Sequence, residues 1–123
     1  MSQTENVDYP RFEITNNADG TYNWELWSVN ARCLVSVKNV SLSLSELEKR
    51  INTIKTHVEK RHFDRKKHHD DKHYLFDHVS DDPFEVLYRS KLYTSFQSVD
   101  KAIFAIQRDA PDAPIDHVDR RRL

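Results

Sequence analysis

SLSELEKRINTIKTHV (residues 43–58) decides the fold, because its apolar residues recur at the spacing of an amphipathic helix. The apolar stripe consists of Leu44, Leu47, Ile51, Ile54 and Val58. Ser43 and Glu46 have the spacing of a capping box, in which each side chain accepts a hydrogen bond from a backbone N–H left free at the start of a helix. The segment therefore predicts a helix that packs one face on a core.

A second segment repeats this pattern 52 residues later. SFQSVDKAIFAIQ (residues 95–107) predicts a helix with its stripe at Phe96, Val99, Ile103 and Ile106. The same offset continues upstream of both helices and pairs Tyr22 with Tyr74, Trp24 with Phe76, Leu34 with Val86, Val35 with Leu87, and Ser43 with Ser95. Such self-similarity predicts a duplicated unit.

Two parts of the repeat do not match. Leu26 falls on His78, and the segment Phe12-Glu13-Ile14 falls on the charged segment Asp64-Arg65-Lys66. We therefore expect the second unit to have lost its first strand to a charged connector.

Apolar residues alternate with polar ones in the segments upstream of each helix, which predicts short strands. The predicted fold class is α+β, with an antiparallel sheet and two helices on one face, from two unequal strand-strand(-strand)-helix repeats. The predicted organisation is a flexible leader at 1–10, a first unit at 11–58, a charged connector at 59–73, a second, truncated unit at 74–113, and a tail at 114–123.

Four segments carry a resemblance to a known family: Phe12-Glu13-Ile14, Asp19-Gly20-Thr21-Tyr22-Asn23-Trp24-Glu25-Leu26, Tyr93-Thr94-Ser95 before the second helix, and Ala110-Pro111-Asp112-Ala113 after it. The first two resemble the opening of the YegP-like family of small α+β domains, and the last two resemble that family's helix entry and exit. The chain departs from the family's glycine-rich pattern at Asn30-Ala31 and at Val40-Ser41. The resemblance implies strand-strand-strand-helix units that occur in tandem or as dimers, and it brings no catalytic residues.

The amino-acid composition excludes several classes of protein. The chain has 123 residues with 19 Lys and Arg against 20 Asp and Glu, which excludes a general polycation. One cysteine excludes an internal disulfide, and one glycine argues against a loop that cradles phosphates. No apolar run is long enough to span a membrane. We expect a soluble, cytoplasmic protein that is not an enzyme and has no cofactor.

Two clusters of positive charge support an alternative function. They comprise Lys60, Arg61, Arg65, Lys66 and Lys67 in the connector, and Arg120, Arg121 and Arg122 in the tail. Such side chains neutralise phosphates by releasing counterions, so the alternative to protein interaction is nucleic-acid binding. Neighbouring acids dilute this charge, and a solvated face is the plainer interpretation.

Histidines of the connector suggest a metal site. His69 and His73 are four residues apart, so on a helix they would share a face and hold an ion such as zinc. The competing interpretation is a hydrophilic, solvated tract.

Strand geometry points to a contact surface. If Tyr22, Trp24 and Leu26 face the helices, then Asn23, Glu25 and Trp27 point away from them. Trp is enriched at interface hot spots, although a bulge after Leu26 would instead turn Trp27 into the core.

The sequence therefore favours a non-enzymatic protein-interaction module, an adaptor or inhibitor that acts by surface contact or by pairing at a sheet edge left open by the truncated unit. Its expected partner is another protein or a second copy of the chain, as in a dimer, with nucleic acid as the alternative and no membrane.

Overall fold

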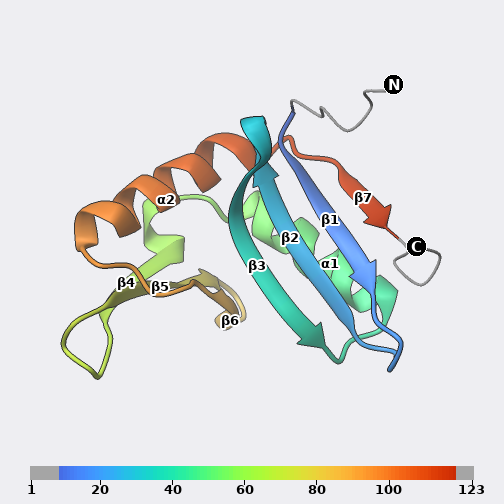
Figure 1. Cartoon of the computed structure of the whole chain (residues 1–123), viewed down its shortest axis with the longest axis horizontal. Coiled ribbons are helices and arrows are strands. Elements are labelled where there is room, and N and C mark those ends of the chain that lie inside the picture. Colours follow the sequence, from blue (N-terminus) through green and yellow to red (C-terminus); the bar gives the residue numbers. More distant parts are fainter. Residues whose placement is uncertain (1–8, 119–123) are drawn as a thin grey trace.

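The computed structural model describes residues 9–118, which form two helices and two β-sheets (Figure 1). The strands are β1 (Arg11–Asn16), β2 (Tyr22–Ser28), β3 (Arg32–Val40), β4 (Phe63–Lys67), β5 (Tyr74–Ser80), β6 (Glu85–Arg89) and β7 (Ile115–Val118). The helices are α1 (Leu44–Thr56) and α2 (Phe96–Asp109), and the short 3-10 helices are η1 (Val29–Ala31) and η2 (Lys60–His62). The α+β class and its two strand-strand-helix units are confirmed.

Both predicted helices begin where the sequence indicates. The Ser43 hydroxyl accepts a hydrogen bond from the Glu46 N–H at 3.2 Å, and the Glu46 carboxylate accepts one from the Ser43 N–H at 2.9 Å. Ser95 caps α2 by accepting a hydrogen bond from the Ser98 N–H. These caps satisfy backbone donors that the first helical turn leaves free.

The duplication extends over the whole of both units. Displacing β2 by 52 residues reproduces the bounds of β5, and the same displacement places β1 on β4 and α1 on α2. The expected loss of the second unit's first strand is therefore wrong, as is the truncation. The sequence pattern did not predict β4, because only its first residue, Phe63, is buried and the other four are exposed and charged.

The strands form two sheets rather than the single antiparallel sheet that the sequence predicted. One sheet has the order β3-β2-β1-β7, and the other has the order β4-β5-β6. β7 pairs in parallel with β1, so the first sheet is mixed. Part of the predicted tail thus completes this sheet, and the N–H of Phe12 donates to the carbonyl oxygen of Pro114 at 2.8 Å.

The first unit turns between β2 and β3 at Asn30-Ala31. Both residues have positive φ, near 60° and 57°. This left-handed conformation favours glycine, so the turn keeps a shape suited to Asn-Gly although alanine occupies its second position.

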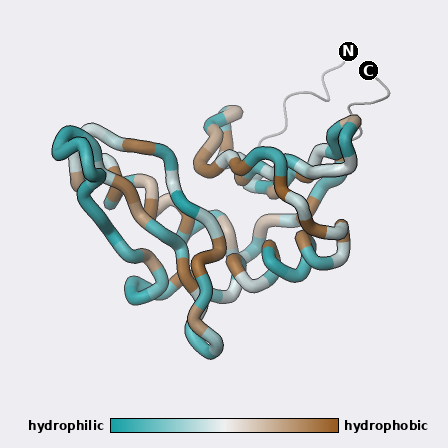
Figure 2. The backbone as a smooth tube through the Cα atoms, turned by 90° about the horizontal axis from the view of Figure 1, so that it is seen from below, coloured by the Kyte–Doolittle hydropathy of each residue, from teal (hydrophilic) through white to brown (hydrophobic). Residues whose placement is uncertain are grey.

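A single core joins the two units. Figure 1 shows α1 behind the four-stranded sheet and α2 reaching from the three-stranded sheet to the four-stranded one. Short hydrophobic and hydrophilic stretches alternate along the chain (Figure 2), as amphipathic elements around one core require. The predicted core residues Leu47, Ile51, Ile54, Val99, Ile103 and Ile106 all belong to this cluster, with Phe12, Trp24, Leu26, Phe76 and Tyr88.

Polar contacts also join the units. The Ser28 hydroxyl donates to the carboxylate of Asp109 at 2.7 Å, which ties the end of β2 to the end of α2. The Gln107 amide donates to the carbonyl oxygen of Val58 at 2.9 Å. Because each bond crosses from one unit to the other, the units hold a fixed relative position. No helix among residues 9–118 is long and apolar enough to cross a membrane.

His78 explains the mismatch in the repeat. It occupies the core position that Leu26 has in the first unit, and both side chains are fully buried. The Nε2–H donates to the carbonyl oxygen of His57, and Nδ1 accepts from the Tyr88 hydroxyl at 2.9 Å. Burial lowers the pKa of His78 from its ordinary value of 6.5 to about 4, so a neutral, doubly hydrogen-bonded imidazole replaces a leucine.

Truncating a buried stripe residue in either helix should destabilise the entire chain. We expect Ile51→Ala and Ile106→Ala each to lower the free energy of unfolding by about 2 to 5 kcal/mol, because each leaves a cavity in the shared core. Urea denaturation followed by tryptophan fluorescence and circular dichroism measures this. The exposed Lys49→Ala is the control, and two separate unfolding transitions would contradict a shared core.

His78 should make the protein sensitive to mild acid. Between pH 6.5 and about 4 the unfolded chain binds a proton at this residue and the native chain does not, so stability falls as the pH falls through that window. The loss should reach about 3 kcal/mol at the acid end. Urea denaturation at a series of pH values measures it.

The matched variants for this test are His78→Leu and His69→Gln. His78→Leu restores the residue of the first unit, and we expect the fall in stability across this window to become clearly smaller even if overall stability drops. Carboxylates with a lowered pKa, such as Asp77 and Asp81, account for the pH dependence that remains near pH 4. His69→Gln changes an exposed histidine and should leave the dependence intact. An unchanged slope in His78→Leu would contradict the assignment.

Candidate functional site

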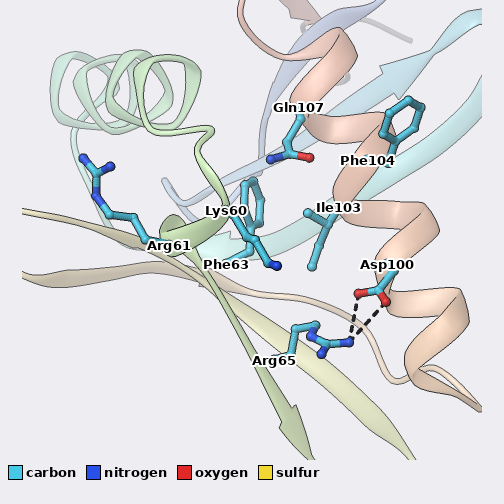
Figure 3. A pocket seen from close by; sticks show the side chains of 8 residues that line it. All are labelled: Lys60, Arg61, Phe63, Arg65, Asp100, Ile103, Phe104 and Gln107. Carbon is cyan, nitrogen blue, oxygen red and sulfur yellow. Dashed lines mark hydrogen bonds and ion pairs between the residues drawn. The ribbon is translucent and has the colours of Figure 1, made fainter.

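A pocket of about 630 Å³ lies between α2 and the segment formed by η2 and β4 (Figure 3). We call it the β4–α2 pocket. It is lined by Lys60, Arg61, Phe63, Arg65, Asp100, Ile103, Phe104 and Gln107. One wall of the pocket therefore comes from the segment that the sequence predicted to be a charged connector, and the other comes from α2.

Apolar side chains form part of the pocket. Phe63 and Ile103 are nearly buried, whereas Phe104 is 64% exposed. Successive helical residues are rotated by about 100°, so Phe104 points away from the core that Ile103 enters. The apolar periodicity did not mark Phe104 as a functional residue, although an aromatic residue directly beside the apolar stripe of α2 was a signal for it.

The polar lining of the pocket is predominantly cationic. Arg65 donates from one guanidinium nitrogen to both carboxylate oxygens of Asp100, at 3.0 and 3.2 Å, and its guanidinium lies 4.8 Å from the centre of the Phe96 ring. Lys60 makes no hydrogen bond or ion pair through its side chain with any residue that the structure describes. Lys60 is thus a positive charge available to a ligand.

The other connector cations proposed for nucleic acid are paired with acids. Arg61 binds Glu59 and also Asp81, at 2.9 Å from the Asp81 carboxylate. Lys66 lies 3.0 Å from the buried carboxylate of Asp77, and Lys67 lies 3.7 Å from Asp71. The hydrogen bond from Arg61 holds the pKa of Asp81 well below its usual value, so that carboxylate stays charged. Arg120, Arg121 and Arg122 lie outside the described residues.

The predicted contact residues share one face of β2. Trp24, Leu26 and Ser28 are buried on the core face, and the half-buried Asn23, Glu25 and Trp27 lie on the other. The pairing of β2 with β3 is irregular between Leu26 and Trp27. Leu26 lies opposite Val35 and Trp27 lies opposite Cys33, so one residue of β3 between these two has no partner on β2. The extra residue is on β3, so the irregularity does not turn Trp27 into the core.

Polar side chains on this outer face of β2 form hydrogen bonds with neighbouring residues of the chain. The indole N–H of Trp27 donates to Glu25 at 3.2 Å, and the Arg11 guanidinium lies 5.6 Å from the centre of its ring. The Asn23 amide oxygen accepts from the Asn17 side chain and from the Asn39 N–H, both at 3.0 Å.

The predicted metal pair does not have the geometry on which it was based. His69 and His73 lie in the turn between β4 and β5 rather than on a helix. His73 lies 2.6 Å from the Asp70 carboxylate, whereas His69 stacks on His68. Within the described part of the chain, the group of three ligand side chains close enough to hold an ion is instead His57, His62 and Asp81.

The second unit has an open sheet edge, as expected, but the strand at that edge differs from the prediction. β4, the strand that was expected to be missing, is an edge strand of the three-stranded sheet. Its residues 64–67 are exposed and charged. Charged edges of this kind oppose pairing with another chain, so strand addition at β4 is disfavoured.

Substitution of Trp27 tests whether the outer face of β2 is a contact surface. We expect Trp27→Ser to change the free energy of unfolding by no more than about 1 kcal/mol, because the side chain lies outside the core. If the face is a contact surface, sedimentation velocity will show altered self-association of this variant. Loss of folding would instead place Trp27 among the residues that stabilise the fold.

Two solved structures have the same fold as this chain. No protein-family model and no curated protein matches the sequence. The solution NMR structure of YegP from E. coli, a protein of unknown function, matches with a TM-score of 0.77 at 14% identity, covering 93% of this chain and 97% of that one. A UPF0339 protein from Shewanella oneidensis matches with a TM-score of 0.77 at 14% identity, covering 89% of this chain and 92% of that one. The chain therefore shares the fold of the YegP and UPF0339 proteins, as its first strands and second helix led us to expect.

Proposed function

We propose that the chain is a non-enzymatic interaction module that binds an acidic segment of a partner protein in the β4–α2 pocket. The observation that carries the proposal is the exposed ring of Phe104 on the same pocket as the unpaired ammonium of Lys60. Exposed aromatic side chains in a concave site are typical anchors for a partner.

The lining defines the chemistry of the partner segment. A large apolar side chain fits against Ile103 and Phe104, where it removes apolar surface from water. A carboxylate of the same segment fits beside Lys60, because three cations and one carboxylate line the pocket. Complementary charge of this kind favours the correct partner and speeds the encounter.

The pocket offers little for catalysis. The described residues that line it include no thiol, hydroxyl or imidazole group, and its one carboxylate, Asp100, is paired with Arg65, which leaves the amine of Lys60 as the one unpaired candidate for a base or nucleophile. Its mixed apolar and cationic lining fits recognition of a peptide.

Nucleic-acid binding has less support from the geometry. Phosphate binding requires cations that are free to replace counterions. Arg61, Arg65 and Lys66 each form an ion pair at 3.0 Å or less with a neighbouring acid. A polyanion would have to displace these acids.

Peptide selection tests the proposal. We would select random peptides displayed on phage against the full chain and measure the affinity of an enriched peptide by fluorescence anisotropy. We expect enrichment of peptides that combine acidic residues with a large apolar residue. Phe104→Ser should weaken binding at least tenfold, which is about 1.4 kcal/mol, and Lys60→Ser should weaken it and reduce its salt dependence.

The matched control is Phe84→Ser. Phe84 is 70% exposed and does not line the pocket, so its replacement removes a comparably exposed ring elsewhere. Equal loss of affinity in Phe84→Ser and Phe104→Ser would overturn the pocket as the binding site. Steeply salt-dependent binding of a DNA oligonucleotide, with no acidic peptide enriched, would favour the nucleic-acid alternative.

A further inference from the structure

We propose that His57, His62 and Asp81 form a binding site for a transition-metal ion of the zinc class. The three side chains come from the end of α1, from η2 and from the residue after β5. One ligand atom from each lies within 4.8 Å of the others. The site is separate from His69 and His73, the pair that the sequence suggested.

The ligand set suits zinc. Two imidazoles and one carboxylate are typical ligands of Zn²⁺, and three protein ligands leave a fourth position for water. His62 is only 2% exposed, and its Nε2 lies 2.9 Å from a carboxylate oxygen of Asp81. The rings of His57 and His62 are 4.8 Å apart between centroids. Ligand atoms around one zinc ion stand about 3 to 3.5 Å apart, so small side-chain movements close the site.

One ring nitrogen of His57 has no partner among the described residues. Its Nδ1 lies 2.8 Å from the carbonyl oxygen of Thr53, to which it donates a proton. The lone pair is then on Nε2, which makes no hydrogen bond to any residue between 9 and 118. A metal-binding histidine commonly donates its other N–H to a carbonyl in this way.

His62 and Asp81 must each exchange a partner for the metal. His62 Nδ1 accepts the Glu59 N–H at 3.1 Å, so its proton is on Nε2, facing Asp81. Binding through Nε2 moves that proton to Nδ1 and breaks the bond from Glu59. Asp81 must also loosen its two hydrogen bonds from Arg61, at 2.9 and 3.3 Å. Arg61 thus competes directly with the metal.

The ion would link the two repeat units. His57 follows the helix of the first unit, whereas Asp81 follows the central strand of the second. A ligand that binds only the folded chain stabilises it, so the metal should raise the melting temperature.

A competition titration tests the site. The full chain, free of affinity tags, is titrated with Zn²⁺ against a chromophoric chelator, and we expect one equivalent to bind. His57→Gln and Asp81→Asn should each lower the affinity at least tenfold. Arg61→Gln should raise the affinity several-fold because it frees Asp81, an effect that a loss of folding would not produce.

The matched control is the double variant His69→Gln/His73→Gln. It should bind zinc as the parent does and show the same rise in melting temperature. Loss of zinc binding in this control, or unchanged binding in both His57→Gln and Asp81→Asn, would overturn the proposal. Absence of saturable binding to the parent chain would overturn it as well. Circular dichroism of each metal-free variant verifies that it is folded.

Discussion

The burial of two helical stripes in one core is the constraint on which the rest of the structure depends. Each repeat unit brings a helix that is too short to be stable alone and a small sheet with one apolar face. The stripes of α1 and α2 belong to the same buried cluster, together with strand residues of both units. The second sheet, the turn after β5 and the β4–α2 pocket are therefore held in place by packing that neither unit provides by itself.

The β4–α2 pocket and the proposed metal site are joined by one residue, Arg61. Arg61 lines the β4–α2 pocket and also holds the carboxylate of Asp81. A partner carboxylate that recruits Arg61 would release Asp81, and a metal ion on Asp81 would release Arg61. The two proposed ligands therefore need not compete, and each removes an interaction that opposes the other.

Sequence patterns predicted the parts of this fold that depend on local periodicity. The stripes around Ile51 and Ile106 and the serine caps define both helices, because these signals lie within a few residues of one another. β4 has no such signal, since four of its five residues are exposed and charged and show no apolar alternation. The division into two sheets depends on packing between distant segments. For the same reason the sequence showed neither the role of Phe104 nor the approach of Asp81 to His57 and His62, which only the folded chain brings together.

The parallel pairing of β7 with β1 sets the order in which the chain can fold. β1, β2 and β3 are adjacent in sequence and pair through short turns, whereas Phe12 meets Ile115 only after both units have been traversed. The entropic cost of closing this loop precedes any gain from the pairing, and core contacts formed within the loop reduce it. On the ribosome, the outer edge of β1 must consequently stay without its neighbour until the second unit has been made, which leaves a chaperone or another nascent chain an exposed strand edge during synthesis.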